Sequence, residues 1–324
     1  DLSRGLGDVY KRQVLQFPCF KTIIYKLLIY LSIDAPYSLI ITRVYNIFKK
    51  LIKILMFSFL KKKKVISHLK LSGVIGNAGK FRQGIDYSSQ EEIIKKAFSL
   101  KKALVVAITI NSPGGSPVQS HLIYKLIKEQ SKKTKKKVIV FAEDVAASGG
   151  YLIACAGDEI YANSSSIIGS IGVISASFGF KNLIEKIGVQ RRVYTAGKNK
   201  STLDPFLDEK EEDINRLKNI QLEIHQDFID VVEESRKEKL NKKSGIELFS
   251  GEFWAGKKAK ELGLIDGLGN AEQILREKYG DQIEIKKFEK SKGWLSKKLS
   301  SSENYTDKLI LSLIHISEPT RQIV

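Results

Sequence analysis

Two stretches of almost continuous apolar residues, each followed by a small-residue turn and then by helical spacing, most constrain the fold of this chain. The first covers residues 103–110 and ends at a Pro-Gly-Gly turn, after which residues 117–131 place apolar side chains at helical spacing. The second covers 137–142 and leads to a helix expected at 148–156. Strands that are apolar at nearly every position are typical of a parallel sheet buried on both faces. The repeat therefore predicts an α/β fold with right-handed crossovers.

The rest of the central region continues this pattern. From Pro205 to about Lys239, apolar residues at helical spacing predict a long amphipathic helix that packs across the sheet or against a neighbouring subunit. One α/β domain over residues 65–290, followed by a polar tail at 291–324, accounts for the pattern. Further strands are expected at 65–75, 167–174 and 191–195, and further helices at 89–100, 253–262 and 271–279.

Residues 1–64 form a basic apolar leader with 13 Lys and Arg against 3 Asp and Glu. Charged residues divide it into apolar pieces of about ten residues, whereas a membrane-spanning helix needs about 20. Two interpretations are open: an upstream or disordered stretch outside the working protein, or an amphipathic membrane-surface anchor helped by Lys61–Lys64. Met56 is the single methionine and the expected true start, and residues 8–13 and 311–321 are interpreted as artefactual.

Composition argues against several classes of function. The net charge is +18, but residues 1–64 contribute +10 and 282–324 contribute +3, which leaves +5 for the central region. A nucleic-acid-binding domain would carry a basic stripe there, so no nucleic-acid partner is expected. Two cysteines cannot build a disulfide framework, and no Cys/His cluster has zinc-ligand spacing, so no zinc site is expected.

Ser148 is the first candidate for chemistry, because it follows a buried strand and begins a helix. A serine nucleophile needs backbone N–H donors for the oxyanion and a base within hydrogen-bond reach. The N–H of Gly149, together with that of Gly114 or Gly115, is a candidate oxyanion hole. The alternative is that Ser148 only caps its helix.

The base is not determined by these patterns. His225 is a candidate, although a histidine between apolar helix positions is more often a packing residue, and no G-x-S-x-G elbow is present. A lysine acts as a base only where burial lowers its pKa from about 10.4. The polar loop 196–201 holds Lys198 and Lys200, and spacing alone does not choose between them.

Six segments, in this order along the chain, resemble the bacterial signal peptide peptidase and protease IV family of SppA and SohB. They are Asn111-Ser112-Pro113-Gly114-Gly115, residues 144–151, residues 168–173, Gly197-Lys198-Asn199-Lys200, residues 249–256 and residues 263–266. The resemblance implies a Clp/crotonase-like fold of repeated β-β-α units in a superhelix, and a Ser–Lys dyad. In that dyad Ser148 is the nucleophile, Lys200 the general base with Lys198 as the fallback, and Ser170 orients the lysine amine.

The resemblance also implies a serine endopeptidase that cleaves short apolar peptides, such as signal-peptide remnants, without a metal or cofactor. It implies a bacterial homo-oligomer, membrane-associated or cytoplasmic, whose active sites are shared if the lysine comes from an adjacent subunit. Three alternatives stay open: a Clp-type Ser–His protease, a crotonase-type acyl-CoA enzyme that needs no serine nucleophile, and a non-catalytic oligomeric scaffold.

Overall fold

The computed structural model describes residues 42, 45–50, 63–76 and 84–289. The chain divides into two units, 1–62 and 63–324. In the first unit the described residues are helical and exposed. Met56, most of the expected leader and the polar tail lie outside the described residues. Within the part that is described, no helix is both long and apolar enough to cross a membrane.

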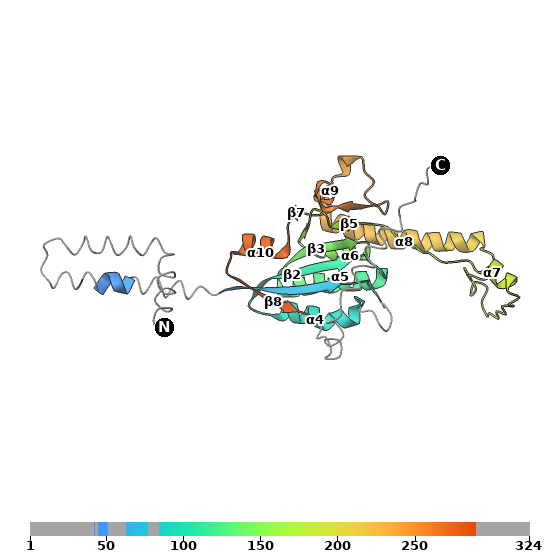
Figure 1. Ribbon diagram of the computed structural model, residues 1–324, viewed down its shortest axis with the longest axis horizontal. Helices are drawn as coiled ribbons and strands as arrows, with labels where there is room; N and C mark the ends of the chain where they lie inside the picture. The colour runs from blue at the N-terminus through green and yellow to red at the C-terminus, as the bar shows by residue number, and fades with distance from the viewer. Residues whose placement is uncertain (1–41, 43–44, 51–62, 77–83, 290–324) are drawn as a thin grey trace, which may run out of the picture. The chain divides into compact units, whose positions relative to one another are not determined.

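The second unit combines a central sheet with surrounding helices (Figure 1). Its strands are β1 (Lys64–Ser72), β2 (Ala103–Ser112), β3 (Lys137–Ala147), β4 (Glu159–Ala162), β5 (Ile167–Gly169), β6 (Phe253–Ala255), β7 (Gly267–Leu268) and β8 (Ile283–Phe288). Its α-helices are α4 (Tyr87–Ser99), α5 (Pro117–Thr134), α6 (Gly149–Ala154), α7 (Lys181–Lys186), α8 (Glu211–Arg236), α9 (Gly256–Glu261) and α10 (Ala271–Tyr279). Two short 3₁₀ turns, Lys237–Lys239 and Lys242–Ser244, follow α8.

The sheet runs in the order β6-β5-β3-β2-β1-β8, with β4 paired to the first half of β3 and β7 paired to β4. Each pair is parallel except β5 with β6. The expected α/β fold with a parallel-dominated sheet is therefore confirmed. Ser112 is in register with Ala146, and Ala147 with Gly169. Consequently the residues that follow β2, β3 and β5 emerge side by side at one edge.

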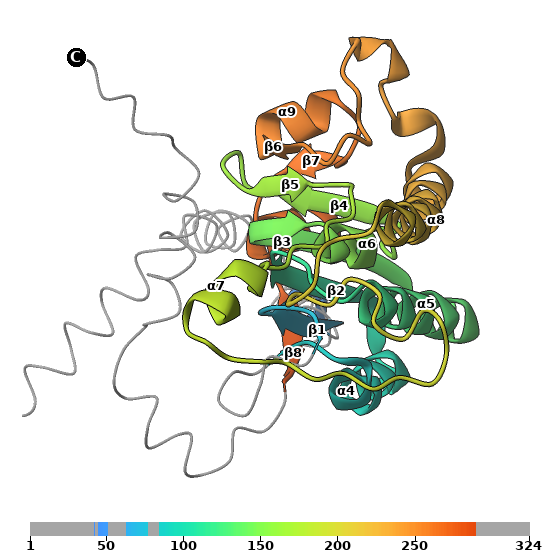
Figure 2. The ribbon, with the colours of Figure 1, turned by 90° about the vertical axis from the view of Figure 1, so that its right-hand side faces the viewer.

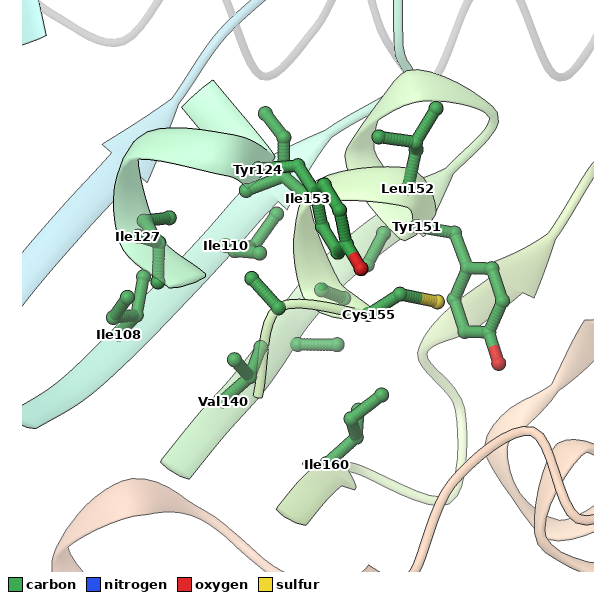
Figure 3. Packing of buried hydrophobic residues seen from close by; sticks show 14 of the residues in the cluster. Ile108, Ile110, Tyr124, Ile127, Val140, Tyr151, Leu152, Ile153, Cys155 and Ile160 are labelled. Carbon is green, nitrogen blue, oxygen red and sulfur yellow. The ribbon is translucent and has the colours of Figure 1, made fainter. Parts of the chain in front are cut away.

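Helices α4, α5, α6 and α8 gather on one side of the sheet (Figure 2), and α10 packs on the other. The larger core lies under α4, α5, α6 and α8, where side chains such as Phe98, Ile127 and Val232 are fully buried. Short helix α6 lies inside this core, and Figure 3 shows Tyr151 and Cys155 side by side, with Ile153 near Tyr124. A smaller core forms under α10 on the opposite face. The expected buried character of the central strands follows from this two-sided cover.

Several expected elements differ from the structure. Residues 191–195 are exposed and form no strand, because they lie between β5 and α8, on a segment that pairs with no described strand. The strand expected to reach residue 174 ends at Gly169, where positive φ at Gly169 and Ser170 turns the backbone. The helix expected from residue 89 begins at Tyr87, because Asp86 caps it through the Ser89 N–H at 2.9 Å.

Strand β8 was not expected from the sequence. It lies at the end of the sheet, pairs among the described strands with β1 alone, and mixes apolar with charged residues. An edge strand of this kind lacks the continuous apolar run that marked β2 and β3.

A buried ion pair ties the end of α8 to the segment after α9. The side chain of Arg236 is 1% exposed, and its Nη1 lies 2.8 Å from Oδ2 of Asp266. The same oxygen accepts the backbone N–H of Ile160 at 2.8 Å, and Oδ1 accepts Lys239 Nζ at 2.6 Å. Burial by itself raises the pKa of Asp266, but the hydrogen bonds from Arg236 and Lys239 outweigh it, so the pKa lies below its ordinary value.

Asp266→Ala is expected to lower the free energy of unfolding by about 3–5 kcal/mol, because it leaves the buried Arg236 guanidinium without its counter-charge. Urea unfolding at pH 7 measures the loss, and Asp281→Ala, at an exposed position, is the matched control. Since the folded-state pKa of Asp266 is depressed, its contribution is present above the unfolded pKa of about 3.9 and disappears as the pH falls through the folded value. Equal stability of both variants would contradict this account.

Candidate active site

Ser148 occupies a strained turn between β3 and α6. Its backbone has φ 50° and ψ −125°, which is unusual for a residue with a side chain. Its N–H donates to the Gly169 carbonyl at 2.8 Å, and its carbonyl accepts from Tyr151 and Leu152. The side chain makes no capping hydrogen bond. Ser148 therefore sits at the N-cap position without using its hydroxyl as a cap, and the strain marks a candidate functional residue.

The glycine turn after β2 lies directly against Ser148. Gly114 has φ 104°, and a Cβ there would stand 2.8 Å from Ser148 Cβ and 2.9 Å from the Gly149 nitrogen. Any larger residue would push the two turns apart. The Gly114 N–H donates to Ser112 Oγ at 3.2 Å. By contrast, the N–H groups of Gly115 and Gly149 find no acceptor among the described residues.

Ser170 is brought to the same edge by the register of β5 with β3. Ala147 pairs with Gly169, so Ser170 follows β5 as Ser148 follows β3. Ser170 has φ 52°, and its N–H donates to the Glu252 carbonyl at 2.7 Å. The backbone beyond it is held by His225 on α8, whose Nε2 lies 3.1 Å from the Ile171 carbonyl. His225 is thus engaged with the backbone, which fits its interpretation as a packing residue.

A cavity of about 360 Å³ opens beside Ser148, between α5, α6 and α8. Its wall includes Gly115, Ser148 and Gly149, and most of the remainder is apolar. Two ionisable residues also line it, His121 on α5 and Asp227 on α8. The pKa of His121 is lowered by burial and by Lys125, and Asp227 opposes the shift only in part. The imidazole is therefore neutral at pH 7.

The structure does not bring Lys200 to this cavity within one chain. Lys200 is exposed in a turn closed by its own N–H and the Gly197 carbonyl at 3.2 Å. Neither Lys200 nor Lys198 lines the cavity, and among described residues no hydrogen bond joins Lys200 to Ser148 or Ser170. Both lysines belong to the segment between β5 and α8, which extends past the N-terminal end of α8 around α7 (Figure 1).

Neither His121 nor Asp227 was predicted from the sequence as a residue of the site. The signal for Asp227 was a charged residue on the apolar side of α8, since it follows Ile224 by three positions and precedes Phe228 and Val231. For His121 the signal was its place one turn into the helix after the glycine pair. In the part of the chain that is described, no three His, Cys, Asp or Glu residues gather as metal ligands would.

Comparison with known proteins identifies the relatives of this chain. Residues 130–282 match the model of Peptidase family S49. A putative protease of Synechocystis is 31% identical over 212 residues, which cover 65% of this chain and 72% of that protein. A putative signal peptide peptidase SppA of Enterococcus faecium is 30% identical over 218 residues, which cover 65% of this chain and 62% of that protein.

A third relative, from Brucella abortus, carries the name Na(+)/H(+) antiporter NhaA. It is 56% identical over 232 residues, which cover 71% of this chain but only 31% of that protein. Because about two thirds of the Brucella protein has no counterpart here, its name transfers no transport function to this chain. The Synechocystis relative is matched over most of its length. The chain belongs to peptidase family S49.

Proposed function

We propose that this chain is a serine endopeptidase that cleaves short apolar peptides, such as signal-peptide remnants, through an acyl-enzyme on Ser148. One observation carries the proposal: the side chain of the strained Ser148 makes no capping hydrogen bond and lies beside an open, largely apolar cavity, next to two backbone N–H groups that have no acceptor among the described residues. We assign the peptidase domain to residues 65–290 and its architecture to the Clp/crotonase-like superhelix of β-β-α units. We place the protein in bacteria, at a membrane surface or in the cytoplasm.

In this mechanism Ser148 Oγ attacks the scissile carbonyl while a base accepts its proton. The carbonyl oxygen becomes an oxyanion, and the N–H groups of Gly115 and Gly149 are its donors. Gly115 is favoured over Gly114 because the Gly114 N–H already donates to Ser112. Each donor is typically worth about 3–4 kcal/mol of barrier. The base returns the proton to the leaving amine, and water activated by the same base then hydrolyses the acyl-enzyme.

Lys200 of a second copy is the base in this proposal, with Ser170 orienting its amine. The segment that carries Lys200 exposes large apolar side chains, of which Ile174, Phe178 and Tyr194 are 88%, 78% and 89% exposed. Large apolar side chains that are this exposed along one segment favour a protein interface. A homo-oligomer that buries it would deliver Lys200 to the Ser148 of a neighbour, which the geometry of one chain does not do.

His121 is the second candidate for the base, and it would make the enzyme a Ser–His peptidase. It is favoured by one observation, namely that His121 lines the same cavity as Ser148 within one chain. However, no hydrogen bond links His121 to Ser148 or to Asp227. The two bases differ in their pH profiles. Cleavage that depends on a neutral lysine rises towards alkaline pH, whereas a histidine whose pKa lies below its ordinary value of about 6.5 would lose activity only on the acidic side.

A fluorophosphonate probe tests the nucleophile. It is expected to modify the protein covalently at Ser148, because an activated serine beside two oxyanion donors reacts with phosphonyl fluorides, and peptide mapping by mass spectrometry locates the adduct. Ser165→Ala, at an exposed serine outside the cavity, is the control that keeps the label. Absence of any adduct would favour a crotonase-type enzyme or a scaffold, and an adduct that persists in Ser148→Ala would overturn the assignment.

A further inference from the structure

The cavity beside Ser148 combines an apolar wall with a single acidic group. The wall is formed by aliphatic and aromatic side chains from α5, α6, α8 and the segment after β5, namely Val118, Leu122, Leu152, Val173, Ile224 and Phe228. Its volume of about 360 Å³ lies at the small end of the range for ligand pockets. A cavity of this size next to a nucleophile suits one substrate side chain rather than a folded surface.

Asp227 gives this cavity a negative charge. Its carboxylate forms no hydrogen bond or ion pair with any described residue, although it acts on His121 at longer range. The next aspartate on the same helix, Asp230, accepts Gln226 Nε2 at 2.8 Å and does not line the cavity. The neutral His121 supplies no counter-charge at pH 7. Asp227 is therefore an exposed carboxylate that lines a largely apolar pocket and has no ion-pair partner among the residues that the structure describes.

We propose that this pocket selects a substrate side chain with an aliphatic stem and a cationic end, lysine or arginine, and that Asp227 is its counter-charge. The inference rests on the proposed function and specifies its substrates as apolar peptides with a basic residue near the scissile bond. The stem of lysine packs along apolar walls while its ammonium reaches a polar group. A purely apolar side chain would instead desolvate Asp227 without pairing it, which costs free energy.

Peptide pairs that differ only by lysine and norleucine test this selection, because the two side chains share the same stem and differ in the ammonium. The swap is placed in turn at each of the residues that precede the scissile bond. At one position the unmodified protein is expected to cleave the lysine peptide with a kcat/KM about fivefold higher than that for the norleucine peptide. This is the size of effect expected for a partly exposed ion pair. Asp227→Asn is expected to abolish that preference by lowering kcat/KM for the lysine peptide and modestly raising it for the norleucine peptide, because the apolar side chain then no longer desolvates a charged carboxylate. Asp230→Asn is the matched control.

Three other results would overturn the inference. Norleucine preferred at every position, or a lysine preference that survives Asp227→Asn, would remove Asp227 as the counter-charge. An equal loss for both peptides in Asp227→Asn would instead make Asp227 a residue that orients His121. Covalent labelling by peptidyl phosphonates with the same lysine and norleucine swap tests the peptidase function and the side-chain selection separately. If neither phosphonate forms an adduct at Ser148, the proposed function is refuted. If both form adducts at equal rates, only the selection is refuted.

Discussion

Ser148→Ala is expected to reduce peptide cleavage by at least about 10⁴-fold, to the level that oxyanion donors and binding alone support. The reason is chemical, since without Oγ no acyl-enzyme forms and the reaction must proceed by direct attack of water. Initial rates with a fluorogenic apolar peptide measure the loss. Because the Ser148 side chain makes no capping hydrogen bond, the free energy of unfolding should change by less than about 0.5 kcal/mol.

The combination of lost cleavage and kept stability distinguishes this serine from a structural one. A serine that capped α6 would cost about 1 kcal/mol on replacement by alanine and would leave the chemistry largely intact. Ser165→Ala, at an exposed position, controls for the loss of a hydroxyl elsewhere on the protein. Substantial activity in Ser148→Ala would exclude the acyl-enzyme mechanism and favour the crotonase-type or scaffold alternative.

The parts of the fold that could be predicted are those encoded locally. The continuous apolar runs of β2 and β3 and the glycines after β2 follow from burial and backbone conformation, which act over a few residues. The α/β class followed from their order. The adjacency of Gly114 to Ser148 was also foreseeable, because parallel neighbours end at one edge.

Other features depend on which elements meet in space. The cavity forms because α5 and α8, about 100 residues apart in sequence, both pack beside α6, so the shared position of His121 and Asp227 had no local signal strong enough to predict it. The apolar residues at 191–195 fitted a strand pattern, but their side chains are exposed. A pattern of apolar residues predicts burial without stating whether the chain's own core or another molecule provides it.

Lys200 lies on an exposed segment of this kind, so the identity of the base depends on whether a second copy covers that segment. Two variants, Ser148→Ala and Lys200→Ala, are each expected to be inactive alone and to regain activity when co-expressed. If every site takes its serine from one copy and its lysine from the next, random assembly at equal expression pairs an intact serine with an intact lysine in about one quarter of sites. The purified mixture should therefore show roughly a quarter of the unmodified activity, and Lys198→Ala, two residues away, should stay active alone.

The complementation result separates three arrangements, because each depends on a different connection between Ser148 and its base. A base within the same chain gives no recovery in the mixture, since each chain then lacks one member of its own dyad. Activity kept in Lys200→Ala but lost in His121→Ala would assign the base to His121 and make the enzyme a Ser–His peptidase. Recovery in the mixture requires a contact between copies, for which the exposed apolar side chains around Lys200 are the candidate surface. Replacing Phe178 by serine should then weaken both assembly and recovery, while leaving the rate of unfolding of the single chain unchanged.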